Sequence, residues 1–425
     1  MNWTLAALAV ALLGYAAVSG RLAGTPVTAP MVFTIAGLIV GIDAIGLVTP
    51  VVSGEAVKLL AEVTLALVLF ADASRINLGT LRGEVSVPAR LLGIGLPLTI
   101  ALGFGCAVLL FGTFSWTEAL LLAIVLAPTD AALGQAVVTL ERIPSRVRQG
   151  LNVESGLNDG ICVPLLLIVL AIEDAETTTE STTGAIQVVL EQIGYGIVGG
   201  VIAGLAAATI VRVAGSRSFV DESWLQVVPV AAAALAYGIA TPLGGSGFIA
   251  AFAAGTVYGA LRQSGSGETE YLIEEAGEIS GALTFIVFGV VLLGPALHDL
   301  TWPIIGYAAL SLTIVRMLPV ALALLGTHAR SPTVGFIGWF GPRGLASIVF
   351  AIIIEEGSPL PNEHTLLTTV YLTIGLSVLL HGLTAAPFAN RYARWFESHP
   401  KGEAPALESG QVTEVRPRGA VRPSA

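Results

Sequence analysis

Long runs of apolar residues, separated by short polar segments, follow one another along the whole chain. A helix that crosses the roughly 30 Å hydrocarbon core of a bilayer takes about 20 such residues. The runs lack the strict alternation of membrane β-strands, so they predict helices and not a barrel. We expect thirteen membrane spans, near residues 3–20, 29–49, 54–72, 87–112, 116–140, 150–172, 185–212, 224–241, 245–262, 277–297, 302–326, 333–355 and 365–390.

Composition supports a polytopic membrane protein. The chain is 54% hydrophobic and 12% charged, whereas a soluble domain carries about 25% charged residues. Acidic residues outnumber basic ones by 30 to 20, which argues against a nucleic-acid partner. Cys106 and Cys162 lie inside apolar runs and offer neither a disulfide framework nor metal-ligand spacing. The first run has no charged start and no small-residue cleavage site, so it is expected to be a retained helix.

Basic residues predict the orientation in the membrane. The loops after odd-numbered spans, together with the C-terminal end, hold 17 of the 20 Lys and Arg residues. By the positive-inside rule these parts are cytoplasmic and the N-terminus is outside, in a cell (inner) membrane. Residues 1–396 are expected to form the transmembrane domain. Residues 397–425 are rich in Pro, Gly and Ser with mixed charge, which predicts a short disordered cytoplasmic tail.

Two spans carry a proline and a charge at their centre. Span five has Pro128 followed by Thr129 and Asp130, and span twelve has Pro342 followed by Arg343. Each is the fifth span of a six-span half, and span seven lies between the halves, so the sequence predicts inverted repeats with two broken crossing helices. Interrupted spans at corresponding positions are typical of a transporter's binding site. We expect Arg343 to offset the dipoles of the half-helices.

Polar residues at the start of span six complete a candidate cation site. Ser155 and Asp159 are four residues apart and share one side of a helix, next to Asn158. If Asp159 meets Asp130, their carboxylates with Thr129 and Ser155 form a hard oxygen site suited to Na⁺, K⁺ or Li⁺. Ionisable groups at membrane depth are functional candidates by default. The structural alternative is a polar clamp between helices, which does not explain the two breaks.

Glu154 and Arg316 are predicted to be structural partners. Arg316 lies within an apolar span and needs a nearby acid, because a buried charge without its partner is costly. Asp72 is a further acid at membrane depth, in span three.

Several motifs together resemble the NhaP/NHE-type monovalent cation:proton antiporters of the sodium/hydrogen exchanger family. The match runs from about span three to the end of span thirteen. The motifs are Ala-Pro-Thr-Asp130, Asn-Val-Glu-Ser-Gly-Leu-Asn158-Asp159-Gly, Gly-Gly-Ser-Gly-Phe-Ile-Ala-Ala-Phe-Ala-Ala-Gly255, Gly-Pro-Arg343-Gly and Ser-Val-Leu-Leu-His-Gly-Leu-Thr384.

The resemblance implies a homodimer that exchanges a monovalent cation for a proton by elevator-like alternating access. A mobile core would comprise spans 4–6 (about 87–172) and 11–13 (about 302–390), and spans 1–3 and 7–10 would form the dimerisation domain.

Carried over by motif, the resemblance assigns roles to individual residues. It implies that Asp159 and Asp130, with Thr129 and Ser155, hold the cation, and that Asn158 is their neutral partner. It also implies an internal ion pair between Glu154 and Arg316, and it places Asp72 near the cytoplasmic funnel. Because Asn158 does not titrate, electroneutral 1:1 exchange is expected. No cofactor is expected beyond the transported Na⁺, K⁺ or Li⁺ and H⁺.

Two other classes of protein share individual features with this sequence. Gly244-Gly-Ser246-Gly247 fits the G-x-S-G pattern of intramembrane serine proteases, with His381 as a possible base. That pattern is weak in a chain with 49 glycines, and it leaves the broken helices unexplained, so no enzyme is expected. A channel would need no titrating carboxylate. The five histidines are spread along the chain, which argues against a histidine metal site.

Overall fold

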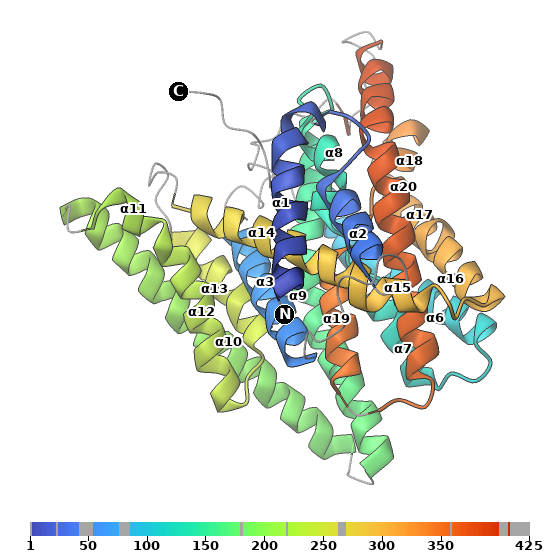
Figure 1. Cartoon of the computed structure of the whole chain (residues 1–425), viewed down its shortest axis with the longest axis horizontal. Coiled ribbons are helices and arrows are strands. Elements are labelled where there is room, and N and C mark those ends of the chain that lie inside the picture. The colour runs from blue at the N-terminus through green and yellow to red at the C-terminus, as the bar shows by residue number, and fades with distance from the viewer. Residues whose placement is uncertain are drawn as a thin grey trace. The chain divides into compact units, whose positions relative to one another are not determined.

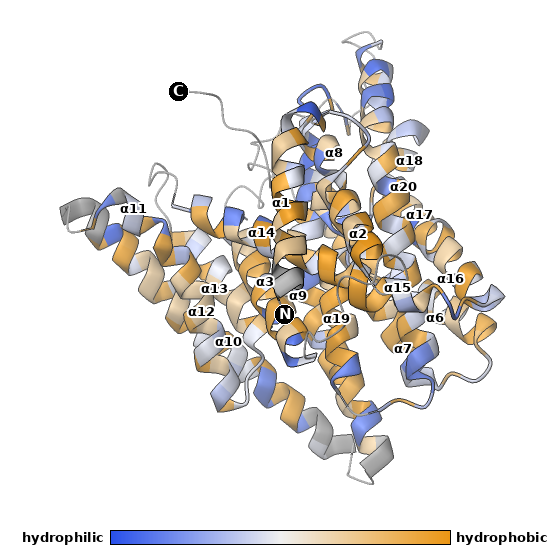
Figure 2. Cartoon of the chain, viewed as in Figure 1, coloured by the Kyte–Doolittle hydropathy of each residue, from blue (hydrophilic) through white to orange (hydrophobic). Residues whose placement is uncertain are grey.

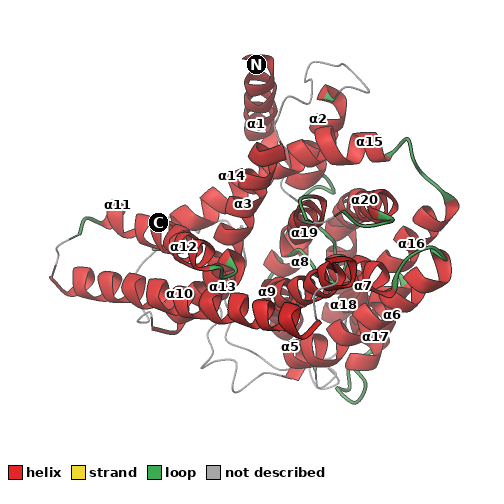
Figure 3. Ribbon diagram, turned by 90° about the horizontal axis from the view of Figure 1, so that it is seen from below, coloured by secondary structure: helices red, strands yellow, loops and turns green. Residues whose placement is uncertain are grey.

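The computed structural model describes residues 2–22, 24–41, 54–75, 86–178, 182–217, 220–261, 269–357, 359–398 and 407–408. Within these ranges every regular element is helical and no strand occurs, as Figure 3 shows. Apolar residues dominate most of the helices (Figure 2). The predicted all-α class is confirmed for this part of the chain.

Helical segments coincide with each of the thirteen expected spans. Seven described segments are long and apolar enough to cross a membrane, and five shorter apolar helices have 10–17 residues. The number of crossings and the inverted repeat remain predictions. The end of span two (42–49) and most of the predicted tail (399–406 and 409–425) lie outside the described residues.

Contacts divide the chain into two compact units. The first consists of Met1–Leu59, Val85–Asn158 and Gly281–Ala425, and the second of Leu60–Glu84 and Asp159–Ser280. Figure 1 labels the helices along the chain. Three helices contribute residues to both units: α3 (Gly54–Arg75), α9 (Ser145–Thr178) and α14 (Tyr271–Val287).

The other helices belong to one unit each. The first unit contains α1 (Asn2–Leu22), α2 (Ala29–Val40), α5 (Ser86–Arg90), η1 (Leu91–Gly95), α6 (Leu96–Leu110), α7 (Trp116–Val125), η2 (Ala131–Gly134), α8 (Gln135–Thr139), η4 (Phe288–Leu293), α15 (Gly294–Ala296), α16 (Trp302–Leu312), α17 (Ile314–Ala323), α18 (Ser331–Trp339), α19 (Leu345–Glu355) and α20 (Glu363–Glu397). The second contains α10 (Thr182–Arg217), α11 (Glu222–Leu225), α12 (Val227–Ala240), η3 (Thr241–Leu243) and α13 (Gly247–Leu261).

Local sequence explains where α7 begins and ends. The Ser115 hydroxyl accepts from the Glu118 backbone N–H at 3.0 Å, and the Glu118 carboxylate accepts from the Ser115 N–H at 2.8 Å, which makes a complete capping box. The helix ends at Val125, three residues before Pro128. Proline has no N–H and disfavours helical backbone in the preceding residue, so the helix does not continue through it.

An apolar cluster gathers residues from distant parts of the first unit. It includes Val87, Val138, Phe336 and Tyr392, and it also includes Leu407 from the tail. The carboxylate of Glu408 accepts from the Arg330 N–H at 3.3 Å and from the Thr333 hydroxyl. The sequence predicts a disordered tail over residues 397–425, whereas residues 407 and 408 of this segment are buried.

Small residues build the second unit. Its apolar core is rich in alanine, with Ala203, Ala233 and Ala254 fully buried. Three glycines of α10, at positions 196, 200 and 204, face the backbone of α13 at close range. Such spacing of small residues lets two helices approach closely within a membrane.

Candidate functional site

Both predicted helix breaks are present in the first unit. Between α7 and the short helix η2, residues 126–130 are not helical, and between α18 and α19, residues 340–344 are not helical either. A break leaves backbone N–H and C=O groups without partners inside their own helix, and in an apolar interior other groups must satisfy them. The candidate site is built from the groups that do so.

Asp130 joins the two broken segments. Its N–H donates to the Pro342 carbonyl at 2.8 Å. One carboxylate oxygen, Oδ1, accepts from the Ala132 N–H at 2.9 Å, and Oδ2 accepts from the Leu345 N–H at 3.0 Å. A single carboxylate therefore caps the N-terminal ends of both η2 and α19, where helix dipoles favour a negative charge.

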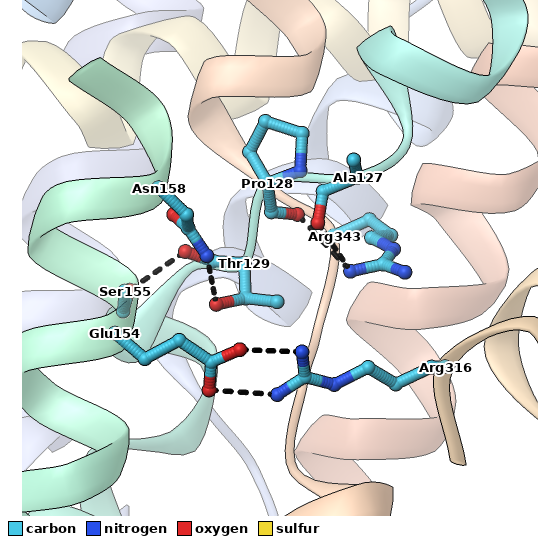
Figure 4. Close-up of polar contacts among 8 residues, drawn as sticks. All are labelled: Ala127, Pro128, Thr129, Glu154, Ser155, Asn158, Arg316 and Arg343. Carbon is cyan, nitrogen blue, oxygen red and sulfur yellow. Dashed lines mark hydrogen bonds and ion pairs between the residues drawn. The ribbon is translucent and has the colours of Figure 1, made fainter. Parts of the chain in front are cut away.

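Arg343 makes the reciprocal connection at the end of α7. Its side chain is fully buried, and Nη1 donates to the carbonyls of Ala127 at 3.0 Å and Pro128 at 3.2 Å (Figure 4). These carbonyls lie just past the C-terminus of α7, where a positive charge is favoured. Ser347 adds a bond from its hydroxyl to the Val125 carbonyl at 2.7 Å.

Helix α9 contacts the first break through two polar side chains. The Ser155 hydroxyl donates to the Thr129 carbonyl at 2.6 Å and accepts from the Ala131 N–H at 2.8 Å. The Asn158 amide donates to the Thr129 hydroxyl at 2.8 Å. The Asn158 amide oxygen is buried and has no hydrogen-bond partner among the residues that the structure describes. The structure thus brings Thr129, Asp130, Ser155 and Asn158 together.

A small cavity opens beside this cluster. Its volume is about 20 Å³, enough for one water-sized occupant. Thr129, Asp130 and Ser155 supply its polar lining, and Val138 and Phe340 belong to its apolar lining. Hydroxyl and carboxylate oxygens beside a space of this size fit a small monovalent cation.

Glu154 and Arg316 form a buried, two-pronged ion pair. The two Nη–Oε distances are 2.5 and 2.8 Å, and both side chains are almost completely enclosed (Figure 4). Gly341 allows the guanidinium to approach, because a Cβ at that position would lie 2.7 Å from Arg316 Cζ. Of the charged side chains in this region, Asp130 and Arg343 bind backbone groups of the broken segments, and Glu154 and Arg316 bind each other.

The other two predicted acids lie in the second unit. Asp159 follows Asn158 on α9, one helical turn after Ser155, and its residue is 7% exposed. Asp72, on α3, lies 3.9 Å from Arg75, which also pairs with Glu274 at 3.0 Å. Asp72 therefore belongs to a three-residue ionic cluster whose other acid is on α14.

Ser377 was not among the predicted site residues, and His381 was a candidate only as the base of the protease alternative. The Ser377 hydroxyl accepts from the Arg343 N–H at 2.6 Å. Ser377 and His381 are both buried on α20. The available signal was the spacing of these two polar residues, four apart within a predicted membrane span. Ser246, the serine of the protease alternative, instead accepts from the Ile249 N–H at 3.4 Å at the start of α13.

Comparison with known proteins places these features in a family. The family described as "Sodium/hydrogen exchanger, transmembrane" matches residues 8–391. The K⁺/H⁺ antiporter NhaP of Alkalimonas amylolytica is 26% identical over 94% of this chain and 68% of its own length. The Na⁺/H⁺ antiporter NhaP of Pseudomonas aeruginosa is 29% identical over 76% of this chain and 78% of its own length.

Relatives from Shewanella are longer, and the chain spans 62% of the K⁺/H⁺ antiporter NhaP2 of Shewanella sp. strain ANA-3 at 26% identity. The fold is also similar to a solved structure, that of the sodium proton antiporter MjNhaP1 from Methanocaldococcus jannaschii at pH 8. The TM-score is 0.72 at 19% identity, over 92% of this chain and 98% of the other.

Proposed function

The chain belongs to the sodium/hydrogen exchanger family, and from this premise we propose that it is a secondary active antiporter that exchanges Na⁺, K⁺ or Li⁺ for H⁺ across a cell membrane. The observation that carries the proposal is the buried cluster of oxygen ligands at two helix breaks. Thr129, Asp130 and Ser155 line one cavity there, and Asn158 binds Thr129.

Asp159 is proposed to be the group that alternates between a proton and the cation. Both carboxylate oxygens of Asp130 accept backbone N–H groups at helix ends, which holds this carboxylate in one place beside the cavity. Asn158 does not titrate. Asp159, one turn from Ser155 on the same helix, is then the remaining acid of the proposed cation site.

If a proton and a cation bind the Asp159 carboxylate in turn, the protein can move one only in exchange for the other. A bare carboxylate in a low-dielectric barrier is heavily penalised, whereas one neutralised by a proton or a cation is not. Only the loaded states then cross, by an elevator-like movement of a core domain within a homodimer. The N-terminus is proposed to be outside and the C-terminus cytoplasmic.

The test is cation-driven proton movement in proteoliposomes, measured with Na⁺, K⁺ and Li⁺ in turn. We expect saturable exchange with the parent protein and none with Asp159→Asn. Asp174→Asn is the matched control, because it makes the same change at an exposed position of the same helix. Substantial exchange by folded Asp159→Asn protein would refute the role of this acid, and an inactive parent would refute the antiporter.

A single alternating acid also predicts electroneutral 1:1 exchange. The rate and the end-point in Na⁺-loaded proteoliposomes should stay unchanged when valinomycin and K⁺ impose a membrane potential. A systematic shift with voltage, or a steady charge transfer on a solid-supported membrane, would contradict the one-acid mechanism.

A further inference from the structure

His381 occupies a buried position on α20 beside the second helix break. Its residue is 1% exposed, and both ring nitrogens have polar neighbours. Nε2 lies 3.0 Å from the carbonyl of Trp339, the last residue of α18. Nδ1 lies 3.1 Å from the Ser377 hydroxyl and 3.1 Å from the Ser377 carbonyl.

These neighbours fit one tautomer of the neutral ring. A carbonyl only accepts, so the Trp339 contact needs a proton on Nε2. The Ser377 hydroxyl oxygen already accepts from the Arg343 N–H, which leaves its own O–H to donate to Nδ1. A neutral imidazole with its proton on Nε2 satisfies the Trp339 carbonyl, the Ser377 hydroxyl and the Arg343 N–H together. The Ser377 carbonyl, although also near Nδ1, lies inside α20, where the helical hydrogen-bond pattern supplies its donor.

The contacts hold the non-helical segment 340–344 at two points. His381 binds the carbonyl directly before the segment, and through Ser377 it holds the Arg343 N–H inside it. The adjoining residues supply the partners of Asp130, because the Pro342 carbonyl accepts from its N–H and the Leu345 N–H donates to its carboxylate. A shift of the segment would therefore move two partners of Asp130 at once.

We propose that His381, as the neutral Nε2–H tautomer, acts with Ser377 as a positioning residue that sets the segment 340–344, and with it the Asp130 carboxylate, for cation binding. This inference rests on the proposed antiport function and names residues that set the geometry of its site. His381 does not touch the cation and does not exchange a proton during transport.

The test measures cation half-saturation and maximal rate separately. Ser377→Ala and His381→Leu each remove one hydrogen bond from the series that connects Trp339, His381, Ser377 and Arg343. Each variant should raise the Na⁺ concentration for half-maximal exchange by about fivefold to tenfold, the factor that the loss of one hydrogen bond implies. The maximal rate should stay within about twofold. Their double variant should be no worse than either single one, because both act through one chain of contacts.

Conservative replacement supplies a rescue. His381→Gln keeps an N–H for the Trp339 carbonyl and should restore at least half of the lost apparent affinity relative to His381→Leu. Should the leucine variant fail to fold, Ser377→Ala and His381→Gln still carry the test. Nitrogen NMR of ¹⁵N-histidine-labelled protein in lipid should show the His381 ring neutral with its proton on Nε2.

Thr384→Val is the matched control. The Thr384 hydroxyl accepts from the Trp339 indole N–H at 2.9 Å, so it also links α18 to α20 but does not hold segment 340–344. This variant should lose thermal stability without a change in half-saturation. The positioning role is wrong if Ser377→Ala and His381→Leu also lose stability without a change in half-saturation. It is equally wrong if NMR shows a doubly protonated His381 ring. An inactive parent would instead refute the antiport function.

Discussion

Two regions of the molecule hold backbones together by opposite means. At the helix breaks of the first unit, a few side chains bind backbone groups one for one, as Asp130 and Arg343 do. Between α10 and α13 of the second unit, side chains are missing where the helices meet. A Cβ added at Gly200 would lie 2.8 Å from Ala253 Cβ, and one added at Gly204 would lie 2.9 Å from Val257 Cβ.

The two regions therefore depend on different properties of their residues. In an apolar surrounding no water replaces a lost hydrogen bond, so the breaks depend on the identity of a few polar residues. The α10–α13 contact depends on small size alone, and close packing is spread over many atoms. Substitutions in the first region should therefore change transport and stability together or transport alone, whereas those in the second should change stability alone.

Removing one member of the buried ion pair should have the largest effect. Glu154→Ala leaves Arg316 buried without its partner, and we expect a loss of about 3–5 kcal/mol in unfolding free energy. Denaturant unfolding in detergent measures it, and Glu154→Ala with Arg316→Met should recover most of the loss. A single variant as stable as the parent but inactive in transport would place Glu154 in the cation site.

Gly200→Ala tests the packed region. The new methyl group would collide with the α13 backbone, so we expect a loss of about 1–3 kcal/mol in unfolding free energy. Exchange per folded molecule should remain at the parental level. Gly194→Ala on the same helix is the control, since a Cβ there meets nothing within 4 Å. A stable Gly200→Ala protein with altered exchange would remove the distinction between the regions.

Gly344→Ala is the counterpart at the breaks. A Cβ there would lie 2.8 Å from Asp130 Cβ and 2.9 Å from its Cγ. A carboxylate side chain yields more easily than a backbone, so stability should fall by only about 1 kcal/mol. Displacement of Asp130 should lower the exchange rate about tenfold. Gly335→Ala, at a position with open space, is the control; equal exchange rates in the two variants would contradict the prediction.

An ion pair outside the membrane spans should matter least. Arg142 and Glu397 lie 2.6 Å apart with side chains 46% and 47% exposed. Hydrogen bonding to Glu397 raises the pKa of Arg142, so the arginine stays charged at every working pH. Exposed pairs contribute little to stability, and Arg142→Ala should leave the melting temperature and exchange unchanged. A clear loss of either would show that this pair supports the breaks.

The sequence predicted the breaks but not the contacts between them. Pro128 and Pro342 are local features that end a helix wherever they occur in an apolar run. The family predicted from the motifs around Asp130 and Asp159 is confirmed. The bond between Asp130 and Leu345 joins positions 215 residues apart, and no local pattern encodes such a pair.

Helix lengths and His381 show the same limit. Helix α9 covers 34 residues, beyond the expected span 150–172, because its polar ends remain helical after the apolar pattern stops. The protease alternative assigned His381 the role of a base, because its pattern could not reveal that Trp339 and Ser377 bind both ring nitrogens. For Asp130 and His381 alike, the hydrogen-bond partners are distant in the sequence and become neighbours only in the folded chain.

The burial of Leu407 has a consequence for how the chain matures during synthesis. Val87 and Leu407 belong to one apolar cluster. Val87 is translated early and Leu407 late, so the contacts of the cluster cannot all form until Leu407 has been made. Chains emerge from the ribosome N-terminus first. Every helix of the first unit is translated before this leucine is, and the cluster stays incomplete until then. The finishing contact of that core is therefore made only after the last helix of the first unit has been translated, as a late step of biogenesis.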